Sequence, residues 1–178
     1  MEPTSSQVAY TQLEKKHLPK LRIFCDEQIG KDYYSESDLE TILELSRANN
    51  QTCSFLAWDQ DILAAARLTY APGAWTEQAR NITPLKWGVP TDRVGYFKSL
   101  YVDQKYQKMG IGRTLSTMSM DVLKTLETQA IVCHSWLQSP GNSSQIYLQK
   151  FGFTPVQVHP KFWNQIDYDC TRCSPARC

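Results

Sequence analysis

Residues 100–113 read LYVDQKYQKMGIGR, and they predict a strand that runs through a glycine-containing loop into a helix. Gly110 and Gly112 carry no side chain beyond hydrogen, so the N–H groups of the loop can approach a ligand closely. The first turn of the helix adds N–H groups without helical partners and the positive end of the helix dipole. Three cationic side chains accompany the loop: Lys105, Lys108 and Arg113. The stretch therefore predicts an anion site that suits a pyrophosphate.

Three phosphate-binding motifs have glycines in such a loop. A P-loop requires Gly-x-x-x-x-Gly-Lys-Ser/Thr, which the chain lacks. A Rossmann fingerprint requires a third glycine at position 115, where Leu115 stands, and an early place in the chain. The third motif, Gln/Arg-x-x-Gly-x-Gly/Ala, is satisfied by residues 107–112.

The flanking sequence predicts a mixed order of strands and helices. Hydrophobic periodicity favours strands at 7–13, 52–58, 62–70, 94–102, 130–137 and 154–158. It favours helices at 14–29, from Ser37 to Asn49-Asn50, at 112–127 and at 143–151, the last ended by Gly152. This order predicts an α/β (α+β) fold around one sheet. Residues 71–93 are either a long connection whose tryptophans, Trp75 and Trp87, pack against the edge of the core, or a substrate lid.

Composition narrows the class of protein. A length of 178 residues fits one domain, residues 1–178, with a sizeable core. The formal net charge of +1 disfavours a nucleic-acid partner. The N-terminal stretch is polar, and the longest apolar run, residues 62–66, is far too short to span a membrane. We therefore expect a cytoplasmic protein whose six cysteines are thiols.

Two segments together resemble a known family. Residues 100–115 read Leu-x-Val-x-x-x-Tyr-Gln-x-x-Gly-Ile-Gly-x-x-Leu, and residues 147–153 read Tyr-Leu-Gln-Lys-Phe-Gly-Phe. These motifs resemble the GNAT superfamily of acetyl-CoA-dependent N-acetyltransferases. The resemblance covers residues 52–158 and leaves a cysteine-containing tail at 159–178. It implies a central mixed, mostly antiparallel sheet flanked by helices, with splayed strands that bind acetyl-CoA.

The resemblance also implies where acetyl-CoA, the co-substrate, binds. The end of the strand before the loop would pair with the pantetheine arm like an added strand. The loop amides would bind the pyrophosphate, and N–H groups near the acetyl carbonyl would stabilise the oxyanion. The residues so assigned are Leu100, Tyr101, Val102, Gln107, Lys108, Met109, Gly110, Ile111, Gly112, Arg113, Thr114 and Asn142.

The catalytic residues match the family less well. Relatives often have a tyrosine four residues before the glycine of the Gly-Phe corner, as general acid toward the CoA thiolate. That position is Leu148 here, and counting from Asn142 instead gives Gln149. Tyr147 lies beside both positions and is either the acid, if the helix is shifted, or a core aromatic.

The general base is open as well. Many relatives place a glutamate on the strand that corresponds to residues 94–102, and this strand has none. His134 on the next strand and Asp92 near the strand entrance are the candidates, although a lone histidine on an apolar strand is often structural. Cys133 offers a covalent acetyl-cysteine route, but a buried structural thiol is the simpler interpretation.

The C-terminal cysteines form a separate feature. Cys170, Cys173 and Cys178, with His159 or Asp169 upstream, have a spacing compatible with zinc, and an unliganded tail is the alternative.

We therefore expect an N-acetyltransferase in which a primary amine of a small molecule or peptide attacks acetyl-CoA directly. No nucleic acid or membrane partner is expected, and a homodimer is compatible with the sequence. A non-catalytic acyl-CoA-binding module is the alternative.

Overall fold

A five-stranded sheet forms the centre of the computed structural model, which describes residues 8–77, 82–137, 139–162 and 169–170. The strand order is β1-β5-β6-β7-β8, antiparallel except for the parallel pair β7 and β8. These strands are β1 (Ala9–Gln12), β5 (Phe55–Asp59), β6 (Ile62–Tyr70), β7 (Val94–Val102) and β8 (Ala130–Val132). Two short ladders pair β2 (Gly30–Lys31) with β9 (Asp169–Cys170), and β3 (Arg47–Ala48) with β4 (Gln51–Thr52). The predicted mixed, mostly antiparallel sheet is confirmed.

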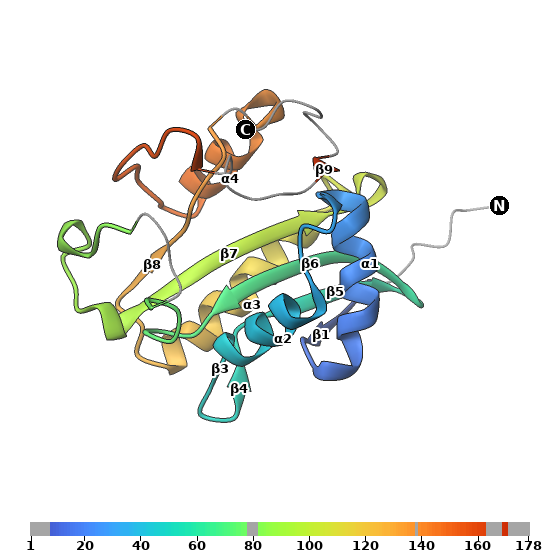
Figure 1. Ribbon diagram of the computed structural model, residues 1–178, viewed down its shortest axis with the longest axis horizontal. Helices are drawn as coiled ribbons and strands as arrows, with labels where there is room; N and C mark the ends of the chain where they lie inside the picture. The colour runs from blue at the N-terminus through green and yellow to red at the C-terminus, as the bar shows by residue number, and fades with distance from the viewer. Residues whose placement is uncertain (1–7, 78–81, 138, 163–168, 171–178) are drawn as a thin grey trace.

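Helices cover both faces of the sheet (Figure 1). The helices are α1 (Leu18–Gln28), α2 (Glu36–Leu45), α3 (Ile111–Thr125) and α4 (Ser143–Lys150). Buried side chains of α1 and α2, including Leu21 and Leu39, share a core with Leu56 and Leu68 of the sheet. On the other face, α3 buries Leu115 against β5 and β6. Successive side chains of β7 point to opposite faces of the sheet, toward α1 and α2 or toward α3. This alternation decides on which face each site residue lies.

Short helix signals explain the helix boundaries. The Ser35 hydroxyl accepts from the Asp38 N–H and the Asp38 carboxylate accepts from the Ser35 N–H, so α2 begins at Glu36, one residue before the predicted Ser37. Asn49 and Asn50, predicted to end this helix, instead form the turn between β3 and β4 with φ of 50° and 60°. The helix has already ended at Leu45.

Two predicted strands are corrected. The strand predicted at 130–137 ends at Val132, because β7 pairs with it only from Val94 to Tyr96. Residues 154–158, also predicted as a strand, have no regular secondary structure and no strand partner among the described residues.

The long connection before β7 is anchored in the core. Trp75 is 1% exposed, donates its Nε1–H to the Val94 carbonyl at 2.8 Å and stacks on Tyr96 at 4.7 Å between ring centroids. The first part of this connection therefore has a structural role, because Trp75 fills space in the hydrophobic core.

No helix within the described ranges is long and apolar enough to cross a membrane.

Candidate active site

The central feature of the site is the divergence of β7 and β8. Their pairing ends at Tyr96 and Val132, whereas β7 continues to Val102. Figure 1 shows the chain after β8 turning away from β7 toward α4. Within the described ranges no strand pairs with this edge of β7 beyond Tyr96, so its main-chain groups are open to an extended ligand. We call the space between the two diverging strands the gap, and the end at Tyr96 and Val132 its apex.

A β-bulge marks β7 beside the apex. Leu68 of β6 lies opposite Ser99, and the next residue, Thr69, lies opposite Phe97. Lys98 is therefore the additional residue on β7. A bulge increases the local twist and bends the strand, which helps to turn β7 away from β8.

The other end of the gap is formed by the loop between β7 and α3. The Asp103 carboxylate accepts from the Lys105 N–H at 2.8 Å, and the Gln107 side chain donates to the Val102 carbonyl at 3.1 Å. The first helical hydrogen bond of α3 runs from the Thr114 N–H to the Gly110 carbonyl. The four residues before α3 are all exposed: Gln107, Lys108, Met109 and Gly110. The N–H groups of residues 111–113 thus lie at a solvent-facing helix start that suits an anion.

The two glycines of this loop have different roles. Gly110 has φ of 80° and open space around the position of a Cβ, so its backbone conformation explains the residue. A Cβ on Gly112 would lie 3.2 Å from Leu100 Cδ2 and 3.5 Å from Val102 Cγ2. Gly112 therefore permits close packing of α3 against β7, and the approach of a ligand to its backbone stays a prediction.

Tyr147 on α4 reaches back to α3. Its hydroxyl lies 2.8 Å from the Gly112 carbonyl and 2.6 Å from the Ser116 hydroxyl. Burial raises the pKa of Tyr147, so the phenol keeps its proton at neutral pH. Leu148 lines a cavity described below, and Gln149 is exposed. Of the three positions considered for the general acid, Tyr147 is therefore the one whose side chain faces α3. Asn142 is exposed at the start of α4, where it has φ of 54°.

His134 lies on the opposite side of the sheet from Tyr147. Its Nδ1 is 2.8 Å from the Tyr96 hydroxyl, and its ring stacks on Phe162 at 4.2 Å between centroids. His159 lies next to it at 5.6 Å. Asp92, the other candidate base, is exposed before the first residue of β7, at the end of the strand away from the loop. The geometry therefore brings His134, and not Asp92, to the apex of the gap.

A comparison with family profiles identifies the family. A profile of the acetyltransferase (GNAT) family matches residues 18–153. The chain belongs to the GNAT acetyltransferase family. It is thus an acyltransferase by family, although a search of curated proteins finds no significant match.

Solved structures share the GNAT fold at low sequence identity. The aminoglycoside N-acetyltransferase AAC(6')-Iy in complex with CoA has a TM-score of 0.64 and 17% identity, covering 97% of this chain and 100% of that one. AAC(6')-Ih from Acinetobacter baumannii has a TM-score of 0.63 and 13% identity, covering 88% and 97%. The ribosomal-protein-S18-alanine N-acetyltransferase from Escherichia coli has a TM-score of 0.61 and 14% identity, covering 88% and 83%. These likenesses show the fold.

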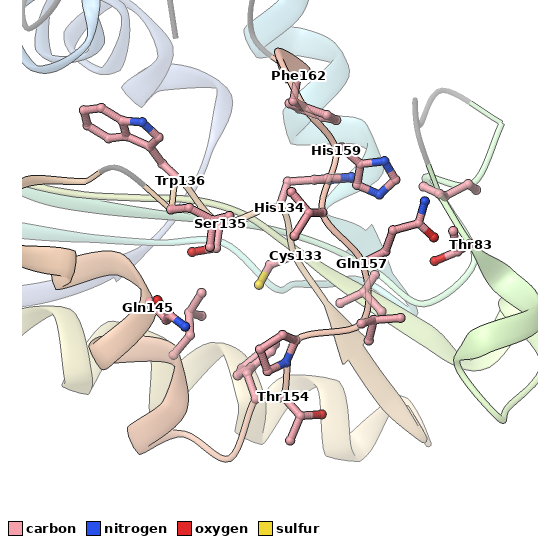
Figure 2. A pocket seen from close by; sticks show the side chains of 18 of the residues that line it. Thr83, Cys133, His134, Ser135, Trp136, Gln145, Thr154, Gln157, His159 and Phe162 are labelled. Atoms are coloured by element: carbon pink, nitrogen blue, oxygen red, sulfur yellow. The ribbon is translucent and has the colours of Figure 1, made fainter.

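A cavity of about 600 Å³ lies beside β8 of this GNAT fold. Its walls come from residues 82–87, the chain from Ile131 to Leu137, α4, and the chain from Phe153 to Phe162 (Figure 2). No residue of β7 lines it, so it lies on the far side of β8 from the gap, and His134 borders both. Its lining, as far as the structure describes it, includes no aspartate or glutamate.

The remaining candidates from the sequence are cysteines. Burial raises the pKa of the Cys133 thiol to about 11, so the protonated thiol prevails at neutral pH and a covalent route is disfavoured. Cys170 pairs through its backbone with Gly30, whereas Cys173 and Cys178 lie outside the described residues. No metal-binding group of three side chains occurs in the part of the chain that the structure describes, and zinc at the tail stays a prediction.

Tyr96 is a residue that the sequence offers for orienting substrate or water, but the sequence reveals neither its pairing with His134 nor the burial of Arg67 at the apex. Tyr96, the partner of His134, is 38 residues away from it in sequence. Arg67 is 3% exposed within the apolar strand β6. A lone arginine in the otherwise apolar run 62–70 was the available signal.

Proposed function

We propose that this GNAT protein transfers the acetyl group of acetyl-CoA to a primary amine. The observation that carries the proposal is the unpaired edge of β7 leading from an open helix N-terminus to the apex of the gap. An anion at the start of α3 and an extended arm along β7 would place a thioester at the apex. CoA-binding residues from Leu100 to Thr114 would supply mainly main-chain groups to the ligand.

Bound acetyl-CoA supplies an activated acyl group with a thiol as leaving group. The amine nitrogen attacks the carbonyl carbon, a C–N bond forms, and the C–S bond breaks with its electron pair passing to sulfur. N–H groups of the β7 edge stabilise the developing oxyanion. His134 takes the proton lost by the amine, and the protonated Tyr147 returns a proton to the thiolate. The role of His134 requires the tautomer whose Nδ1–H donates to Tyr96, which makes Nε2 the basic atom.

The cavity beside β8 is the proposed site of the acceptor. Its lining combines aromatic rings, including Trp87 and Phe162, with the polar groups of Thr83 and Gln157. Because the described lining carries no carboxylate, it offers no partner for several ammonium groups at once. A small-molecule or peptide amine with an apolar or aromatic body therefore fits better than a polycation.

A thiol-release assay over a panel of amines tests this function. The panel includes an arylalkylamine, peptides with free N-termini and an aminoglycoside, each with acetyl-CoA. Release of CoA with the first two classes, and weaker release with the aminoglycoside, is expected. Binding of acetyl-CoA by calorimetry without turnover on any amine would instead favour the second candidate, a non-catalytic acyl-CoA-binding module. That candidate is favoured by the engagement of the Tyr147 hydroxyl with α3.

A further inference from the structure

Arg67 is a buried cation with unsatisfied hydrogen-bond donors. It is 3% exposed on β6, and its Nε and Nη2 atoms have no hydrogen-bond partner among the described residues. No ion pair involving it occurs there either. Its charge contacts one ring, with the guanidinium carbon 3.4 Å from the centroid of Phe97. A buried charge without a carboxylate partner is costly, and natural structures rarely keep one without a function.

The neighbours of Arg67 place its charge at the apex of the gap. Arg67 lies opposite Leu100 of β7, and its side chain runs over the α3 face of the sheet to the ring of Phe97. Phe97 is the first residue of β7 beyond the last pair with β8. On the other strand, the first residue beyond that pair is Cys133, and the charge of Arg67 opposes the rise in the Cys133 pKa that burial causes. The guanidinium thus lies beneath the point where the strands separate.

Tyr147 belongs to the same group on the α3 face. Burial raises the pKa of Tyr147, and both its hydrogen bond with Ser116 and the charge of Arg67 act to lower it. His134 and Tyr96 meet on the other face, packed with Phe162. The sheet therefore separates His134, which borders the proposed acceptor cavity, from a buried cation and a phenol on the α3 side.

An extended arm bound along β7 would end beside this cation. Between Val102 and Phe97 the strand covers about 16 Å at roughly 3.3 Å per residue. An arm anchored at the start of α3 and lying along that edge brings its reactive end to the apex. The sulfur is the atom that gains negative charge when the acyl group leaves.

We propose that Arg67 supplies the buried positive charge that stabilises the CoA thiolate as it leaves. The inference rests on the proposed function, because it requires a thioester in the gap. As the amine displaces sulfur, the electron pair of the C–S bond passes to sulfur, and the guanidinium compensates that charge until Tyr147 supplies a proton. An unpaired cation costs stability in the free protein and lowers the energy of the charged state in the reaction.

The thiol pKa of bound CoA tests the proposal in the unaltered protein. The thiolate absorbs in the ultraviolet, and a difference spectrum against the complex with desulfo-CoA removes the contributions of adenine and protein. A bound thiol pKa at least one unit below the usual value of about 8.5 is expected. A bound pKa at or above that of free CoA overturns the proposal.

Substitutions separate the charge from the packing. Arg67→Met removes the charge at similar length, Arg67→Lys keeps it, and Thr69→Val is a matched control at the next buried position of β6 on the same face. Arg67→Met should lower kcat by about 10²–10³-fold with the KM for acetyl-CoA within threefold. It should also return the thiol pKa of bound CoA to that of free CoA, whereas Arg67→Lys should retain most of the shift and Thr69→Val all of it.

The thermal midpoint of the free protein gives an independent readout. Since Arg67→Met removes an uncompensated buried charge, its midpoint should equal or exceed that of the wild type. A normal kcat in Arg67→Met, together with a bound thiol pKa as low as that of the wild-type complex, would refute the role of Arg67 while leaving the acetyltransferase intact. Failure of the wild type to bind acetyl-CoA would refute the proposed function itself.

Discussion

A single negative charge at Gly110 should weaken the binding of CoA. Gly110 is exposed, has φ of 80°, and has no heavy atom within 4 Å of the position of a Cβ. A side chain there meets no clash, but the left-handed conformation costs any such variant about 1–2 kcal/mol of folding free energy. Gly110→Glu and Gly110→Gln share this cost and nearly the same shape. Their difference therefore isolates the carboxylate.

The magnitude follows from the separation of charges. A carboxylate about 5 Å from one phosphate charge, at an effective dielectric constant of about 20, is repelled by about 3 kcal/mol. That energy corresponds to roughly 100-fold weaker binding. Because exposed charges are screened, the difference should shrink markedly at high salt.

Calorimetric titration of each variant with CoA at low and high salt measures this effect. Both variants should lose about 2–8 °C of thermal midpoint from the shared strain. Gly110→Gln should bind CoA roughly 100-fold more tightly than Gly110→Glu at low salt. Equal affinities of the two folded variants would show that no phosphate lies at the start of α3.

Three further results are expected. His134→Gln should lower turnover by about 10²–10⁴-fold without changing acetyl-CoA affinity, and retention of normal turnover would remove His134 as the base. Trp75→Ala should cost about 3–5 kcal/mol in urea unfolding, since the indole is 1% exposed and bonded to Val94; a lid residue would instead alter turnover and leave stability unchanged. Burial raises the pKa of both Cys25 and Cys53 to about 12, so above about pH 9 the unfolded thiols lose protons that the native ones keep. Stability should therefore fall by up to about 3 kcal/mol per pH unit between about pH 9 and 11, and a double Cys→Ala variant should flatten that slope.

The sequence predicted well the strand and the helix that frame the proposed donor site, because their signals are local. The predicted strand at 94–102 is β7 with the same bounds, and the predicted helix at 112–127 is α3 within two residues at each end. β-Branched and aromatic residues, a positive-φ glycine and an amphipathic period all act within a few residues of each other. The corner at Gly152 is also local, since its N–H and that of Phe153 close the end of α4.

The errors arose where a feature depends on a distant partner. Residues 133–137 continue the apolar segment 130–132 in sequence, but they line a cavity instead of pairing with β7. Residues 154–158 alternate like a strand, yet a strand requires a neighbour that the pattern does not reveal. The packing role of Gly112 was equally hidden, because it depends on Leu100 and Val102 of another element. The pairing of His134 with Tyr96 depends on the parallel register of two strands.

The cavity beside β8 has a wall that the family profile does not reach. The profile ends at residue 153, whereas the chain from Thr154 to Phe162 forms one side of the cavity and is tied to the opposite side by a hydrogen bond from Lys86 to Gln157. Under the proposed function, part of the surface that selects the nucleophile therefore lies outside the stretch that the family profile matches, whereas the strand and helix that would hold the coenzyme lie inside it. Exchange of this terminal segment between homologues would be a direct route to new acceptor preferences, with the thioester chemistry carried along unchanged.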